Sequence, residues 1–135
     1  MIKIAIVDGK GGGLGAAIAK KLAPMKGVEL IALGTNSQAT GNMLKSGARD
    51  GATGENAICH MAGRVDIIVG PMALVVADSM MGEITSKIAQ AVAGSKARKI
   101  LLPTQKCGVD VVGVNDLTMA QLIELVPEKI AEFLK

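Results

Sequence analysis

The chain has 135 residues, the size of a single domain, and half of them are hydrophobic. Phe133 is its one aromatic residue, so the stacking surfaces that single-stranded nucleic acids require are missing, and we expect no nucleic-acid partner. The net charge of +3 is modest, and the one tight basic cluster, at residues 96–99, is typical of the solvated end of an element.

The first expected elements are a strand over residues 2–7 and a helix over residues 15–25. The strand is short, β-branched and almost entirely apolar, which is typical of a parallel strand buried on both faces. Apolar side chains repeat at helical spacing along the helix, with lysines off that line. Between the two elements, five glycines lie within the eight residues 8–15. The pattern predicts a glycine-rich turn at a strand-to-helix junction.

The glycine-rich segment is the main functional signal. The first turn of a helix offers unpaired N–H groups and a positive dipole end, and missing side chains let a phosphate approach closely. The spacing Gly11-x-Gly13-x-x-Ala16 fits the dinucleotide-binding fingerprint, and Gly9-x-x-x-Gly13-x-Gly15 fits that of short-chain dehydrogenases. The alternative is a turn that needs glycine only for backbone angles and packing. We predict a phosphate or nucleotide site at Gly9, Lys10, Gly11, Gly12, Gly13, Leu14 and Gly15.

A second strand, expected over residues 28–33, completes a β-α-β unit. In dinucleotide-binding proteins an acidic residue at the end of this strand takes the ribose hydroxyls. No carboxylate follows here, so we expect Thr35, Asn36 and Ser37 to hydrogen-bond a ribose or phosphate, without the strong preference that a ribose-binding carboxylate gives. Ser37 is equally suited to cap the helix expected over residues 38–46, and the two roles are compatible.

The middle of the chain predicts a short edge strand over residues 48–53, a helix over 55–62 and a buried strand over 65–69. Gly70 and Pro71 follow the last of these. Because the carboxyl ends of strands line the ligand crevice of an open α/β sheet, we place both residues in the site.

Residues 71–94 are expected to be mostly helical. Residues 72–77 are apolar on all sides, which fits either a buried helical turn or a face that docks a second subunit. Since a domain of this size has few places to bury such a segment, we expect a homodimer or higher oligomer that buries about 1,200 Å² or more.

Two further strands are expected over residues 99–103 and 109–114. The connection between them is too short for a parallel crossover, so the last strand should lie antiparallel at the sheet edge. A capping box formed by Thr118 and Gln121 opens the final helix, which Pro127 should kink or restart. Together the elements predict an α/β, Rossmann-like, doubly wound and mostly parallel sheet with an antiparallel edge strand, in one domain spanning the whole chain.

Polar residues near the ends of the later elements are candidates for a substrate site, namely Thr53, Glu55, Asn56, Ser79 and Glu83. Acid–base chemistry would fall to Glu55, Glu83 or Asp78, but the sequence shows no partner for them, and no catalytic residue is assigned.

Cysteine and histidine usage favours a metal-free cytoplasmic protein. Cys59 and Cys107 match neither a metal pair nor a redox Cys-x-x-Cys motif, which favours two reduced thiols. His60 has no second ligand within reach in the sequence, so we expect an ordinary, partly buried histidine. Met1 leads directly into a strand, so we expect no signal peptide, and the longest apolar region, residues 65–82, contains two aspartates and a proline, so we expect no membrane span.

Two enzyme classes are excluded by missing residues. Short-chain dehydrogenases need a Tyr with a Lys four residues later, and the chain has no Tyr. Partition-type ATPases resemble the opening of the loop at Lys10, but they need Lys and then Ser or Thr at the helix start to hold phosphate and magnesium. Here Ala16 and Ala17 follow the glycines, so phosphoryl transfer is not expected.

Several passages together resemble a family of short, functionally uncharacterised bacterial proteins. They are Asp8-Gly9-x-Gly11-Gly12-Gly13-x-Gly15, Gly34-Thr35-Asn36-Ser37-x-Ala39-Thr40, Gly51-Ala52-Thr53-Gly54-Glu55-Asn56-Ala57, Ile68-Val69-Gly70-Pro71 and Ser79-Met80-x-Gly82-Glu83-Ile84-Thr85. The chain departs from that family at Asp78, where the family carries Asn. The resemblance implies a Rossmann-like fold with a glycine-rich nucleotide loop, and it implies no reaction.

We interpret the chain as a small nucleotide-binding protein that takes NAD(P) or another adenine nucleotide, as a sensor, a carrier or a subunit of an assembly. Two alternatives stay open. One is a small isomerase, lyase or transferase that acts on a phosphorylated metabolite with Glu55 or Glu83 as base. The other is a structural oligomer whose glycine loop binds no ligand.

Overall fold

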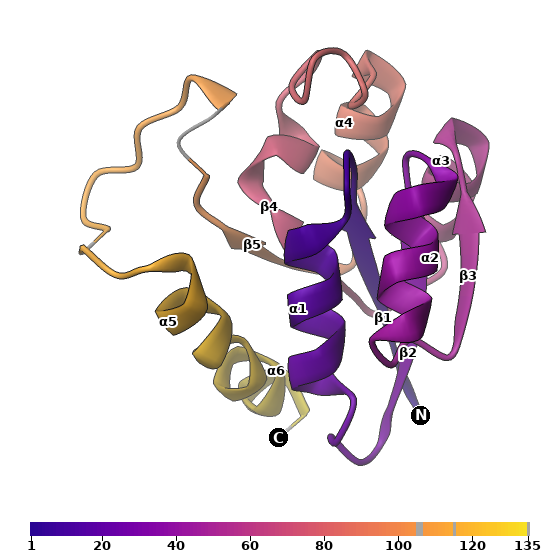
Figure 1. Ribbon diagram of the computed structural model, residues 1–135, viewed down its shortest axis with the longest axis vertical. Coiled ribbons are helices and arrows are strands. Elements are labelled where there is room, and N and C mark those ends of the chain that lie inside the picture. Colours follow the sequence, from indigo (N-terminus) through magenta and orange to yellow (C-terminus); the bar gives the residue numbers. More distant parts are fainter. Residues whose placement is uncertain (105–106, 115, 135) are drawn as a thin grey trace.

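A five-stranded parallel sheet organises the molecule (Figure 1). The computed structural model describes residues 1–104, 107–114 and 116–134. The sheet order is β3-β2-β1-β4-β5, and every pairing of neighbours is parallel. The strands are β1 (Ile2–Asp8), β2 (Val28–Gly34), β3 (Asp50–Thr53), β4 (Ile67–Pro71) and β5 (Arg98–Leu102). The α/β, Rossmann-like, doubly wound fold predicted from the sequence is confirmed.

Helices cover both faces of the sheet, as the alternation of β1 requires. Successive strand residues point to opposite faces, so Ile4 and Ile6 pack in one core cluster and Ala5 and Val7 in the other. The first cluster is covered by α1 (Gly13–Leu22), α2 (Ser37–Lys45) and α6 (Val126–Leu134), with the short α5 (Met119–Glu124) beside them. The second is covered by α3 (Glu55–Ala62), α4 (Ser86–Ala93) and the 3-10 turn η1 (Met72–Val75).

The strand order creates a crevice between β1 and β4. From β1 the chain winds outward through β2 to β3, and it then returns to β4 on the other side of β1. Loops that leave neighbouring strands in opposite directions open a crevice at the carboxyl edge of the sheet, where folds of this kind bind ligands. This edge is at the top of Figure 1, where the glycine-rich turn leads into α1.

The antiparallel edge strand expected over residues 109–114 was wrong. The described part of this segment is an exposed loop, with Val112 99% exposed, so β5 is an edge of the sheet. Gly108 and Gly113 adopt φ values of 73° and 91°, which interrupt the extended conformation that the β-branched residues favour.

Residues 71–94, which were expected to be mostly helical, are helical only at η1 and in α4. Pro71 ends β4, η1 is a single turn, and α4 begins only at Ser86, where the Thr85 side chain caps it. Residues 76–85, the return loop, run back toward the glycine-rich turn. Leu74 of η1 is fully buried in the chain's own core, so residues 72–77 no longer supply the argument for a second subunit. Association itself stays a prediction.

The C-terminal helices follow the sequence pattern closely. The capping box of Thr118 and Gln121 is formed, and the helix breaks at Leu125 and restarts as α6. Pro127 is the second residue of α6, where a missing N–H costs little. Phe133 is 38% exposed, so the buried face ends near Ile130. Among the described residues, no helix combines the length and the apolar character that crossing a bilayer requires.

Candidate functional site

Asp8, the last residue of β1, fixes the turn into α1. Its buried carboxylate accepts the N–H of Gly9 at 2.8 Å with Oδ1 and the N–H of Gly15 at 2.7 Å with Oδ2. Burial raises the pKa of Asp8 above its usual value, although the two N–H groups act in the opposite direction. The chain's own carboxylate therefore takes one of the helix N–H groups that we had expected to face a phosphate.

Three of the five loop glycines are required by the fold. Gly12 has a φ of 71°, and a Cβ there would lie 2.6 Å from the Ala39 Cα. A Cβ on Gly15 would lie 2.6 Å from the Met43 Sδ, and one on Gly9 would lie 2.8 Å from the Thr35 Oγ1. Packing of the turn against α2 and the end of β2 explains these three positions without a ligand.

Gly11 and Gly13 have no such explanation. A Cβ on either would meet no heavy atom within 4 Å, and neither residue has a left-handed φ. Among the described residues, the N–H groups of Gly11, Gly13 and Leu14 have no hydrogen-bond partner. Both neighbouring carbonyls are already bound, because Asn36 Nδ2 donates to the Lys10 carbonyl at 2.8 Å and Asn42 Nδ2 donates to the Gly11 carbonyl at 2.6 Å. The turn thus keeps uncommitted donors and open space on the same residues.

A hollow of about 340 Å³ lies between this turn and the end of β4. Its volume is near the lower end of the usual range for small-molecule sites, about 300–1,000 Å³. The wall is mainly backbone on the side of the turn and apolar on the side of β4. The lining residues are Asp8, Gly9, Lys10, Gly11, Gly12, Gly13, Leu14, Pro71, Ala73, Met80, Met81, Thr104 and Cys107. The hollow, which we call the carboxyl-edge hollow, lies at the crevice between β1 and β4.

Glu83, from the return loop, lies against the turn and the end of β2, and it does not line the carboxyl-edge hollow. Its Oε1 accepts three hydrogen bonds, at 2.5 Å from Thr35 Oγ1, at 2.8 Å from the Lys10 N–H and at 3.1 Å from Asn36 Nδ2. The bond from Thr35, followed by that from Lys10, holds the pKa of Glu83 below its usual value. A carboxylate therefore does lie at the end of β2, but a distant segment supplies it.

The return loop reaches this position in a strained conformation. Asp78, Met80 and Met81 have φ values of 65°, 56° and 55°, a region that costs non-glycine residues about 1–2 kcal/mol each. Internal bonds offset part of this cost, among them the bond from the buried Ser79 hydroxyl to the Ala73 carbonyl at 2.7 Å. Ser79 is thus a structural residue of the loop.

Five predicted residues lie outside both groups, namely Ser37, Thr53, Glu55, Asn56 and Gly70. Asn36, and not Ser37, is the N-cap of α2, because its side chain accepts the Ala39 N–H at 2.9 Å. Gly70 is buried, and a Cβ there would lie 2.4 Å from the Val7 carbonyl oxygen. Three more residues lie at the end of the edge strand β3 or just after it and are exposed, namely Thr53, Glu55 and Asn56. The structure thus brings the turn and Pro71 together in one place and Thr35, Asn36 and Glu83 in another.

Cysteine and histidine are spread over the molecule. Cys107 lines the carboxyl-edge hollow, with its Sγ 3.2 Å from the Thr104 carbonyl, a placement that no sequence signal indicated. Cys59 is half-buried on α3, and burial raises the pKa of its thiol. His60 is exposed, where we had expected a partly buried ring. Within residues 1–104, 107–114 and 116–134, no three His, Cys, Asp or Glu side chains are grouped to hold a metal ion.

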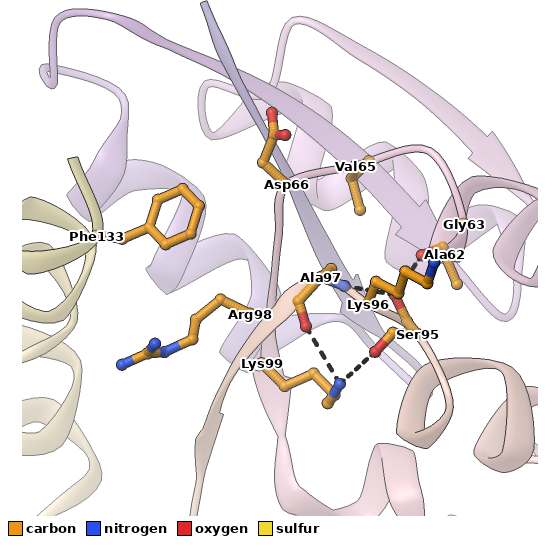
Figure 2. A pocket seen from close by; sticks show the side chains of 10 residues that line it. All are labelled: Ala62, Gly63, Val65, Asp66, Ser95, Lys96, Ala97, Arg98, Lys99 and Phe133. Atoms are coloured by element: carbon orange, nitrogen blue, oxygen red, sulfur yellow. Dashed lines mark hydrogen bonds between the residues drawn. The ribbon is translucent and has the colours of Figure 1, made fainter.

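A second and larger hollow, of about 640 Å³, lies at the opposite edge of the sheet (Figure 2). It is formed at the amino ends of β4 and β5, and Lys96, Arg98 and Lys99 make it basic. The Lys99 ammonium donates to the carbonyls of Ser95 at 2.7 Å and Ala97 at 3.2 Å. We call it the amino-edge hollow.

Comparison with known proteins identifies the family. The model of the family described as domain of unknown function DUF3842 matches residues 3–135, and the chain belongs to that family. No curated protein sequence matches the chain. Among solved structures, it is similar to the dodecameric FMN-dependent UbiX-like decarboxylase from Escherichia coli O157:H7, with 18% identity and a TM-score of 0.46. That similarity covers 97% of this chain and 76% of the other.

Proposed function

We propose that this DUF3842 protein binds a phosphorylated small molecule in the carboxyl-edge hollow, with phosphate oxygens on the N–H groups of Gly11, Gly13 and Leu14. The observation that carries the proposal is the pair Gly11 and Gly13. Alanine in place of a glycine is typically stabilising by about 0.4–1 kcal/mol where the backbone angles allow it, and neither packing nor backbone conformation requires these two glycines. Close approach of a ligand to the backbone supplies the missing reason.

An adenine nucleotide is the ligand class that we favour. Leu14, Pro71, Ala73 and Met80 provide an apolar surface for a base, and Lys10 adds one exposed cation beside the turn. A nucleotide with one base fits the hollow better than NAD(P), because a dinucleotide lying across the turn would need the side that Glu83 covers. The protein would act as a nucleotide sensor, a carrier or a subunit of a homo-oligomer.

The enzyme alternative has weaker support. A carboxylate whose pKa is held low is a weak base, which argues against Glu83 as a proton acceptor. Glu55 follows β3 at the edge of the sheet and does not line the carboxyl-edge hollow. We therefore propose binding and assign no catalytic residue.

The test uses three matched glycine substitutions. Gly11, Gly13 and Gly41 all have open space for a Cβ, but only the first two border the carboxyl-edge hollow. A thermal-shift panel of AMP, ADP, NAD, FMN and ribose 5-phosphate identifies a ligand, and calorimetry then gives its affinity. We expect Gly11→Ala and Gly13→Ala to weaken binding about tenfold or more, since each alanine methyl holds the phosphate off an N–H group worth about 1.5–3 kcal/mol. Gly41→Ala should bind as the wild type does.

All three variants should unfold no more easily than the wild type, because the fold accommodates each methyl group. Equal affinities in the four proteins would place the phosphate elsewhere. A wild-type protein that binds no member of the panel at millimolar concentration would favour the structural oligomer.

A further inference from the structure

Three hydrogen-bond donors from separate parts of the chain converge on one oxygen atom. The Lys10 N–H comes from the glycine-rich turn, and the Thr35 hydroxyl and the Asn36 amide come from the end of β2. All three reach Glu83 Oε1, over distances of 2.5–3.1 Å. An N–H, an O–H and an amide N–H directed at a single point form a site for an acceptor that carries negative charge.

The group that these donors hold comes from far along the chain. Glu83 is 73 residues from Lys10 and 48 from Thr35, and the return loop carries it there through three non-glycine residues with left-handed φ. A Cβ on Gly9 would lie 3.1 Å from Glu83 Oε1 and 2.8 Å from Met80 Sδ, so a glycine at that position lets the loop settle on the turn. The donors are part of the turn and β2, whereas the anion belongs to a separate and strained segment.

We propose that Lys10 N–H, Thr35 Oγ1 and Asn36 Nδ2 form an anion subsite for a phosphate or carboxylate group of a small ligand, and that the Glu83 carboxylate is an internal anion which this group displaces. The subsite lies on the β2 side of the turn and uses none of the N–H groups assigned to the carboxyl-edge hollow. Its test is therefore separate from that of the proposed function. Displacement of Glu83 frees the return loop from the turn.

Inorganic phosphate is the probe, and Glu83→Ala is the first variant. An internal competitor reduces the apparent affinity by the fraction of time that it holds the site, so its removal strengthens binding. We expect Glu83→Ala to bind phosphate about tenfold or more tightly than the wild type in calorimetry at constant ionic strength. Glu83→Gln, which keeps the shape of the side chain and loses the charge, should bind with intermediate affinity. It also serves if the alanine variant fails to fold.

Three control variants test where the phosphate binds. Glu128→Ala removes an exposed carboxylate on α6 and makes the same change in net charge, so it should bind phosphate as the wild type does. Thr35→Val in the Glu83→Ala background removes one donor and should abolish the gain. Gly13→Ala in that background should keep the gain, because Gly13 borders the carboxyl-edge hollow and supplies none of the three donors.

Two results would overturn the proposal. Equal phosphate affinities in the wild type, Glu83→Ala and Glu83→Gln would mean that Glu83 competes with no ligand. A gain that survives Thr35→Val but disappears with Gly13→Ala would place the phosphate in the carboxyl-edge hollow alone. Neither result depends on whether a nucleotide binds to the wild type.

Discussion

The amino and carboxyl edges of the sheet both carry a hollow, and the two hollows differ in whether their polar groups already have hydrogen-bond partners. The amino-edge hollow is larger and more basic, but its Lys99 ammonium is bound to two backbone carbonyls, and Asp66 beside it accepts the Lys3 N–H at 2.8 Å. At the carboxyl edge, the described residues leave the N–H groups of Gly11, Gly13 and Leu14 without a partner. Size and charge favour the amino-edge hollow as a ligand site, whereas uncommitted donors on a rigid turn favour the carboxyl-edge hollow.

The rigidity of that turn comes from the glycines that the fold requires. Gly12 and Gly15 let α2 pack directly on the turn, and the Asp8 carboxylate joins the end of β1 to the first turn of α1. A ligand site needs donors that are held in place before the ligand arrives. The carboxyl edge therefore combines required glycines, which hold the turn, with free glycines, which leave it open.

The largest effect that we expect is the loss of stability in Gly12→Ala. An alanine at position 12 would have to keep a φ of 71°, and its Cβ would lie 2.6 Å from the Ala39 Cα, so α2 must shift. We expect a loss of about 1–3 kcal/mol in the free energy of unfolding, measured by urea denaturation. Gly13→Ala, one residue away, should be neutral or slightly stabilising. Similar losses for the two variants would contradict the division between required and free glycines.

Much of the fold follows from local patterns in the sequence. The β-branched run of β1, the helical spacing of α1 and the capping box at Thr118 each act over a few residues, so they are visible without the structure. The predictions that were wrong also came from local patterns. The described residues offer segment 109–114 no strand partner despite its strand composition, and residues 76–85 contain three non-glycine residues with left-handed φ, which a helix does not accommodate.

The candidate site was predictable only in part. The glycine-rich turn, Thr35 and Asn36 could be proposed from the sequence because they directly follow strands, where ligand-binding residues gather. The sequence could not show which glycines are free, because the answer depends on Ala39 and Met43 of α2. The role of Glu83 was hidden in the same way, since 48 residues separate it from Thr35. Such contacts belong to the tertiary structure, and no local spacing encodes them.

A smaller effect is expected on ligand affinity when cations are removed at one edge of the sheet or the other. Lys10 is an exposed cation beside the uncommitted N–H groups, so Lys10→Ala should weaken binding of a nucleotide such as ADP about three- to tenfold. The loss should shrink as salt rises from 0.05 to about 0.5 M, because exposed charges are screened. Arg98→Ala and Lys99→Ala remove cations from the amino-edge hollow and should leave the affinity unchanged. If these two variants weaken binding as much as Lys10→Ala does, the ligand binds at the amino edge.

The smallest effect concerns the pH dependence of stability at the carboxyl edge. Hydrogen bonds hold the pKa of Glu83 below its usual value, so its ionised form stabilises the folded chain at neutral pH. As the pH falls below about 4.3, the unfolded chain takes up this proton first, and the contribution is lost as the pH falls through the folded pKa.

The raised pKa of Asp8 acts in the opposite sense, because the folded chain binds that proton more tightly and gains stability as the pH falls. When the free energies of unfolding of the wild type and Glu83→Gln are subtracted, the Asp8 contribution largely cancels, although the loss of the Glu83 charge also lowers the pKa of Asp8 slightly. We expect urea denaturation to show Glu83→Gln less stable than the wild type from pH 5 to 7, with a gap that closes as the pH falls toward 3. A gap that stays constant over this range would mean that the Glu83 charge contributes nothing to the hold of the return loop on the turn.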